Sequence, residues 1–194
     1  MACFLIVRKC YPFLVLLGAI CVGAVSKRQK NLRLQQFDEN CDGADVSTYA
    51  AHFRSNELKL ANNKYNLNFE IEIARDWPKD FKIQIDLVRC RHRDSPNTCE
   101  KYQSITIPYF CKLLNMAEKP WTPIFSVMAP KIVCPIKKGS KYRTRNNTSV
   151  DTKAFASLPM IGNYHWIATS KSMDQTTNEL LHCVRTAGQL IYVN

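Results

Sequence analysis

The chain has 194 residues, with 27 Lys or Arg against 16 Asp or Glu, a formal net charge of +11 and nine cysteines. A chain of this length fits one domain with a substantial core, which excludes a small scaffold held together by disulfides alone. The basic charge is compatible with anionic lipid, sulfated glycan or nucleic acid as a partner and does not choose among them.

The first 26 residues have the layout of a secretory signal peptide. Arg8 and Lys9 precede an apolar run, which closes on small residues suited to cleavage after Ala24 or Ser26. The run of about 15 residues is shorter than the roughly 20 that span a bilayer, so a retained anchor is the less favoured alternative. The sequence therefore predicts a secreted, extracellular protein, and cleavage lowers its charge from +11 to +9 because Arg8 and Lys9 are lost.

Cleavage also changes the cysteine count, since three of the nine cysteines lie in the leader. Six remain, and in a secreted chain an even number predicts disulfides rather than a catalytic thiol. No C-x-x-C or H-E-x-x-H spacing occurs, so we expect neither a metal nor a cofactor. The six cysteines of the exported chain are Cys41, Cys90, Cys99, Cys111, Cys134 and Cys183.

Residues 27–40 are polar and basic and show no steady periodicity. We expect them to form a loose N-terminal arm, with the ordered domain at 41–194.

The strongest pattern in the chain is an alternation of apolar with charged or polar residues over 67–73 and again over 81–87. A period of two predicts strands with one buried and one solvent-facing side. A turn at 76–80, which contains Pro78, separates them. We expect the two strands to be neighbours, with the acidic face of the first opposite Lys82 of the second.

The rest of the chain predicts further short strands and few helices. A polar turn at 91–98 follows Cys90, and a bridge from Cys90 to Cys99 would staple that hairpin. Short strands joined by Pro-rich segments are typical of an all-β fold, either a β-sandwich or a cup. We expect strands near 104–107, 164–169, 180–185 and 190–193, and one or two short helices between 110 and 128.

Three motifs follow one another in the second half of the chain: Phe-Cys-Lys-Leu-Leu at 110–114, Cys-Pro-Ile-Lys-Lys-Gly at 134–139 and Leu-Pro-Met-Ile-Gly-Asn-Tyr at 158–164. In this order they resemble the ML lipid-recognition superfamily. The likeness is greatest to its ganglioside-activator-like branch, and within it to the small secreted proteins of insect chemosensory organs. It covers residues 64–193.

The resemblance implies an immunoglobulin-like two-sheet β-sandwich whose sheets splay apart around an apolar cavity for lipid tails. It also implies the disulfides Cys41 to Cys183, Cys90 to Cys99 and Cys111 to Cys134. In the chain-entropy model the longest of these loops contributes ~4–5 kcal/mol of stability and the shortest ~2–3 kcal/mol. The chain lacks the fourth cysteine pair of the ganglioside activator, so no ganglioside-specific role is carried over.

The side chains that would line such a cavity are also the ones that a fully packed core needs, and the residues alone do not distinguish the two. The resemblance favours the cavity. The expected lining residues are Leu67, Phe69, Ile71, Ile73, Phe81, Ile83, Ile85, Leu87, Phe110, Leu114, Trp121, Phe125 and Met128.

Two surface features accompany this prediction. A basic cluster, hereafter the basic turn, could hold an acidic headgroup or dock at an anionic membrane surface, but a solvated hairpin face explains it as well. Nucleic acid is not expected, because aromatic platforms do not alternate with these charges. The basic turn comprises Lys137, Lys138, Lys141, Arg143 and Arg145.

Overlapping sequons at Asn146 and Asn147 predict one glycan.

No enzyme is expected. The candidate bases His52, His92, His165 and His182 have no evident nucleophile, and no G-x-S-x-G motif occurs. We therefore predict a monomeric carrier or presenter of a small hydrophobic ligand, such as a lipid, a fatty derivative or a pheromone-like hydrocarbon. By resemblance it would act in the gustatory or olfactory detection of pheromone, with a receptor as a further partner. The alternative is a basic secreted immune or signalling protein whose sandwich is packed and has no pocket.

Overall fold

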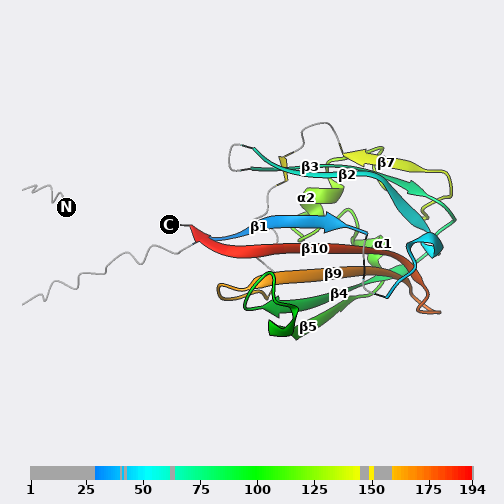
Figure 1. Ribbon diagram of the computed structural model, residues 1–194. Helices are drawn as coiled ribbons and strands as arrows, with labels where there is room; N and C mark the ends of the chain where they lie inside the picture. The colour runs from blue at the N-terminus through cyan, green and yellow to red at the C-terminus, as the bar shows by residue number, and fades with distance from the viewer. Residues whose placement is uncertain are drawn as a thin grey trace, which may run out of the picture.

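The computed structural model describes residues 29–39, 41, 43–61, 64–144, 149–150 and 159–193, and these form two antiparallel β-sheets that face each other (Figure 1). Sheet A has the order β1-β10-β9-β4-β5, and sheet B has the order β2-β3-β7-β6, with β8 paired to β3. This confirms the predicted two-sheet β-sandwich. The strands of sheet A are β1 (Gln29–Asp38), β10 (Leu180–Val193), β9 (His165–Asp174), β4 (Phe81–Cys90) and β5 (Cys99–Ile107). The strands of sheet B are β2 (Ala51–Ala61), β3 (Lys64–Ile73), β7 (Lys141–Thr144), β6 (Met128–Ala129) and β8 (Ser149–Val150).

The described helices are short, as predicted, and the two α-helices lie close together in the chain. They are α1 (Phe110–Leu113) and α2 (Thr122–Phe125), and two single 3-10 turns occur at Val46–Thr48 and Pro96–Thr98. The segment that carries α1 and α2 lies between the two sheets (Figure 1), and Phe110 and Leu114 belong to the same buried cluster as residues of both sheets. None of the described helices is long and apolar enough to cross a membrane.

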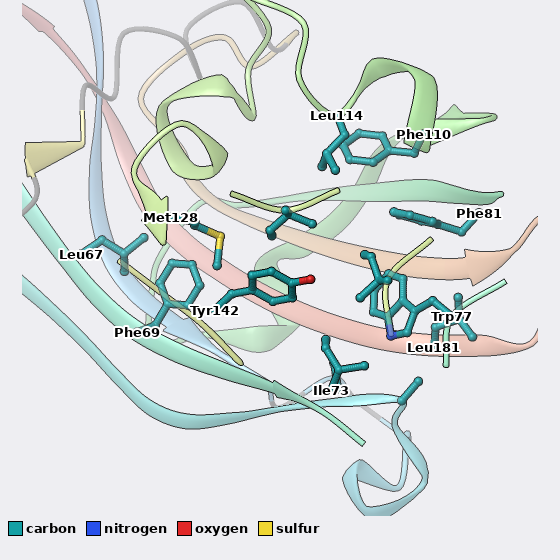
Figure 2. Packing of buried hydrophobic residues seen from close by; sticks show 14 residues of the cluster. Leu67, Phe69, Ile73, Trp77, Phe81, Phe110, Leu114, Met128, Tyr142 and Leu181 are labelled. Atoms are coloured by element: carbon teal, nitrogen blue, oxygen red, sulfur yellow. The ribbon is translucent and has the colours of Figure 1, made fainter. Parts of the chain in front are cut away.

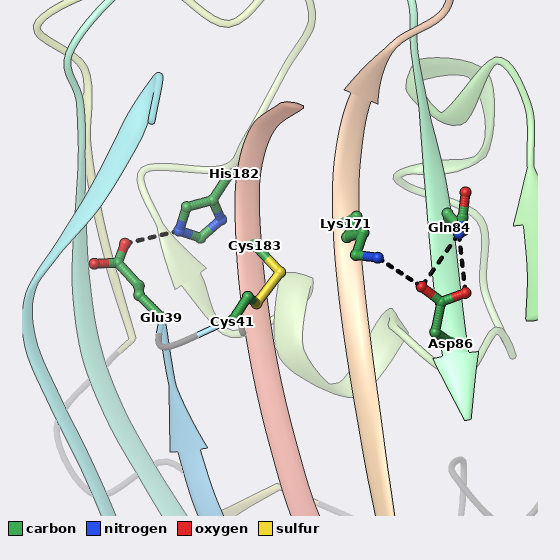
Figure 3. The surroundings of a disulfide bond; sticks show 7 residues. All are labelled: Glu39, Cys41, Gln84, Asp86, Lys171, His182 and Cys183. Atoms are coloured by element: carbon green, nitrogen blue, oxygen red, sulfur yellow. Dashed lines mark hydrogen bonds and ion pairs between the residues drawn. A yellow bond between two sulfur atoms is a disulfide. The ribbon is translucent and has the colours of Figure 1, made fainter. Parts of the chain in front are cut away.

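Three disulfides tie the fold together in the pairing that the family resemblance implies. Cys41–Cys183 joins the segment after β1 to β10, Cys90–Cys99 joins the ends of β4 and β5, and Cys111–Cys134 joins α1 to the loop that leads into β7. Figure 3 shows the first of these bridges. Each bridge links two different elements of the sandwich.

The prediction that the strands at 67–73 and 81–87 are neighbours is wrong. These segments form β3 and β4, which belong to opposite sheets, so the turn at 76–80 crosses between the sheets. Alternation shows which face of a strand is buried but not which strand lies beside it. Glu72 of β3 therefore contacts Arg54 and Lys141, at 2.5 Å and 3.7 Å.

The prediction of a loose arm at 27–40 is also wrong for residues 29–38, which form β1 and pair with β10. Leu34 of this strand is buried, and Phe37 packs against the core. A bulge between Leu34 and Gln36 breaks the period of two and hides the strand from a sequence pattern. A bulge between Phe53 and Ser55 has the same effect on β2, which the sequence did not predict. The leader at 1–26, Arg145 and both sequons lie outside the described residues.

Gly188 provides a test of how closely β1 and β10 approach. A Cβ atom at this position would lie 2.5 Å from the carbonyl oxygen of Arg33 on the paired strand. Because the backbones would have to separate, we expect Gly188→Ala to lower the free energy of unfolding by about 1–3 kcal/mol. Chemical denaturation measures this change, and Gln189→Ala, at the exposed next position, is the control expected within about 0.5 kcal/mol of wild type. Equal stability of the two variants would contradict the close approach.

Candidate functional site: a cavity between the sheets

The inner faces of the two sheets and the helical segment enclose a cavity of about 240 Å³. Ligand pockets usually measure roughly 300–1,000 Å³, so this cavity suits a small ligand. Its lining is mostly aliphatic and aromatic and comes from both sheets and from the segment around α1 and α2. The arrangement is that of a site that removes apolar surface from water.

Sheet A forms one wall. Strands β4, β9 and β10 are hydrogen-bonded side by side, so every second residue of each strand faces the cavity in matching rows. One row places Ile83 of β4 beside Ser172 of β9 and His182 of β10, and the next row places Ile85, Ser170 and Val184 in the same order. This wall therefore combines aliphatic side chains with a few polar ones.

Sheet B forms the opposite wall, and it is more apolar. The inward side of β3 supplies Leu67, Phe69, Ile71 and Ile73, and β7 adds Tyr142. Figure 2 shows Leu67, Phe69, Ile73 and Tyr142 among the side chains packed between the sheets. β-Strand pleating explains why the alternating run at 67–73 contributes alternate positions to one wall.

The segment around α1 and α2 covers the remaining side of the cavity with aromatic rings. The ring of Phe110 lies 4.9 Å from that of Trp121, 6.0 Å from that of Phe125 and 5.6 Å from that of Phe81 on β4, measured between centroids. The Trp121 Nε1 donates a hydrogen bond of 3.1 Å to the carbonyl oxygen of Leu113. The contact with Phe81 joins the helical segment to sheet A, and the other contacts hold the segment together.

The structure brings together all of the lining residues predicted from the sequence except Leu87. Leu87 packs instead in a second buried cluster with Leu34, Met160 and Trp166. That these residues bind a ligand stays a prediction. The sequence analysis missed many further lining residues, and among them are Phe37, Phe53, Trp77, Ile132, Ile136, Tyr142, Met160, Trp166, Ala168, Ser170, Ser172, His182, Val184 and Thr186.

His182 lies in the cavity wall and forms a buried pair with Glu39 (Figure 3). Its Nε2 lies 2.8 Å from the Glu39 Oε1, which also accepts a hydrogen bond of 2.6 Å from the backbone N–H of Phe53. The two side chains are 6% and 13% exposed. Burial raises the pKa of nearby Tyr49, and the negative charge of Glu39 raises it further. The pair thus fixes the chain next to the Cys41–Cys183 bridge.

The other candidate histidines lie on different elements: His52 on β2, His92 in the turn after β4 and His165 at the start of β9. Burial lowers the pKa of His165, and the charge of Arg93 lowers it further. Among the described residues, no three His, Cys, Asp or Glu side chains are grouped so that they could hold a metal ion.

The described members of the basic turn, Lys137, Lys138, Lys141 and Arg143, are exposed. The three lysines lie close to acidic residues. Asp76 accepts a hydrogen bond of 2.7 Å from the backbone N–H of Lys138, and its carboxylate lies 3.5 Å from the Lys137 Nζ. That backbone hydrogen bond, more than any other contact, holds the pKa of Asp76 below its usual range. Binding of a headgroup by the basic turn stays a prediction.

Comparison of the sequence with protein-family models and with curated proteins found no match.

The buried pair gives a stability test. Glu39→Ala leaves His182 and the Phe53 N–H without their buried partner, so we expect the free energy of unfolding to fall by roughly 3 kcal/mol. Glu57→Ala is the matched control, because the Glu57 carboxylate pairs with Lys59 at the surface and its loss should leave stability unchanged. Thermal and urea denaturation of both variants measures the difference. If the two variants are equally stable, Glu39 has no such structural role.

Proposed function

We propose that this protein is a secreted carrier or presenter of a small hydrophobic ligand, which it holds between its two sheets. The observation that supports this most directly is the cavity of about 240 Å³ with its mostly apolar lining. The ligand class proposed is a lipid, a fatty derivative or a pheromone-like compound. By resemblance, the proposed setting is the modulation of pheromone detection by gustatory or olfactory neurons.

The proposed mechanism is burial of apolar surface. Each Å² removed from water contributes ~25 cal/mol, so a hydrocarbon chain gains several kcal/mol before the cost of ordering it. The aromatic cover formed by Phe110, Trp121 and Phe125 supports this mechanism, because its large rings add apolar area to the cavity wall.

Secretion is part of the same proposal. Three disulfides in one small domain are usual in oxidising compartments outside the cytosol, and the N-terminal leader pattern favours export. The alternative of a basic immune or signalling protein with a fully packed sandwich has less support, because the inner faces of the sheets leave space between them.

Filling the cavity tests the proposal. Ala168 lines the cavity from β9, and a tryptophan at this position would occupy part of its volume. We expect Ala168→Trp to weaken uptake of the fluorescent probe N-phenylnaphthylamine by about tenfold or more, which corresponds to about 1.4 kcal/mol. Fluorescence titration of the disulfide-bonded protein measures the affinity.

Thr169→Trp is the matched control, because the next residue of the same strand points to the other face of sheet A. It should bind the probe as wild type does. Near-ultraviolet circular dichroism establishes that both variants keep their tertiary packing, and Ala168→Leu serves as a smaller substitution if the tryptophan variant does not fold. Equal uptake by folded Ala168→Trp and Thr169→Trp would contradict binding in the cavity.

A further inference from the structure

A small group of hydroxyls interrupts the apolar lining of the cavity. Ser170 and Ser172 of β9 and Thr186 of β10 face it from sheet A. The strand register places Ser172 between Ile83 and His182 and places Ser170 between Ile85 and Val184. These serines stand where an inner-face strand position ordinarily carries an aliphatic side chain.

Tyr142 adds a hydroxyl from the opposite wall. Its side chain extends from β7 into the space between the sheets (Figure 2), and the residue is only 5% exposed. Tyr142 also lines the cavity. Hydroxyls from both sheets therefore face one largely apolar cavity.

None of these hydroxyls makes a hydrogen bond within the described part of the chain, and each stays accessible from the cavity. As whole residues, Ser172 is 8% exposed and Tyr142 is 5% exposed, so the cavity is the space that their hydroxyls can reach. A hydroxyl that faces an apolar cavity finds a partner only in water or in a bound molecule. An oxygen atom of a bound ligand would supply the partner, since a hydroxyl both donates and accepts.

The charge of the lining restricts what that oxygen can be. None of the described lining residues is Lys, Arg, Asp or Glu. His182 is the lining residue that can carry a positive charge, and its Nε2 already faces the carboxylate of Glu39. A ligand carboxylate would thus be buried without a free counter-ion, which is unfavourable.

We propose that the cavity takes an oxygenated, uncharged lipid, namely a long-chain alcohol, ester or ketone, and that Ser172 and Tyr142 hydrogen-bond its oxygen. Ser170 and Thr186 flank this site on sheet A. The inference rests on the proposed carrier function and narrows its ligand class, since it favours an oxygenated chain over a plain hydrocarbon and over a fatty acid anion.

The test uses three probes of equal chain length, dodecane, dodecanol and dodecanoate, each displacing N-phenylnaphthylamine from the full disulfide-bonded protein at neutral pH. The variants are Ser172→Ala and Tyr142→Phe, which remove only a hydroxyl. Tyr109→Phe is the matched control, because Tyr109 is 50% exposed and does not line the cavity. Comparing variants for one probe at a time cancels the different solubilities of the probes.

We expect each cavity variant to weaken dodecanol binding by about three- to tenfold, the usual effect of one lost hydrogen bond. Dodecane binding should change by less than about twofold, and dodecanoate should bind wild type more weakly than dodecanol does. The Tm of the ligand-free variants should be unchanged or higher, because the hydroxyls removed have no protein partner.

Three results would overturn this inference while leaving the carrier function intact: an equal effect of the variants on dodecane and dodecanol, dodecanoate binding as tight as dodecanol binding, or a clear fall in the Tm of ligand-free Ser172→Ala or Tyr142→Phe. A wild-type protein that takes up none of the probes would instead overturn the proposed function itself.

Discussion

The burial of Phe110 between the sheets is the contact on which the shape of the cavity depends. Its ring is 1% exposed and meets Phe81 of sheet A on one side and Trp121 and Phe125 of its own segment on the other. Two β-sheets with apolar inner faces would ordinarily interdigitate to form a core about 10 Å thick. Here the helical segment lies between them and contributes its own side chains to the lining, and the adjacent Cys111–Cys134 bridge attaches α1 to the loop that follows β6.

Polar side chains have different surroundings on the two faces of sheet A. Residues 170–172 of β9 show the difference. On the outer face, Asp86 lies 2.8 Å from Lys171 and accepts a hydrogen bond from Gln84 (Figure 3). It also accepts a hydrogen bond from Ser104. Burial raises the pKa of Asp86, but these partners outweigh it and hold the pKa below its usual range.

On the inner face of the same strand, Ser170 and Ser172 line the cavity, and their hydroxyls make no hydrogen bond to the described residues. In the proposed complex, the oxygen of the ligand supplies this partner.

Alternation in the sequence predicted the buried faces of β3 and β4, and with them the side chains that these two strands contribute to the cavity, apart from Leu87. It failed where the period of two is broken. Bulges near Gln36 in β1 and Ser55 in β2 hid both strands, and the pairing of β3 and β4 could not follow from a pattern that describes only one strand at a time. Ser170 and Ser172 were missed because the strand predicted near 164–169 ended before them, whereas β9 continues to Asp174. Only the register with β4 and β10 shows that they face inward.

Native mass spectrometry of the protein secreted from eukaryotic cells shows whether the cavity between the sheets holds a hydrophobic ligand. We expect a species heavier than the disulfide-bonded polypeptide with its glycans, and loss of the added mass on lipid extraction. Mass spectrometry of the extract should identify the released molecule as a lipid. A secreted protein that carries no extractable lipid, and that after refolding takes up no fluorescent fatty probe, would contradict the proposed carrier function.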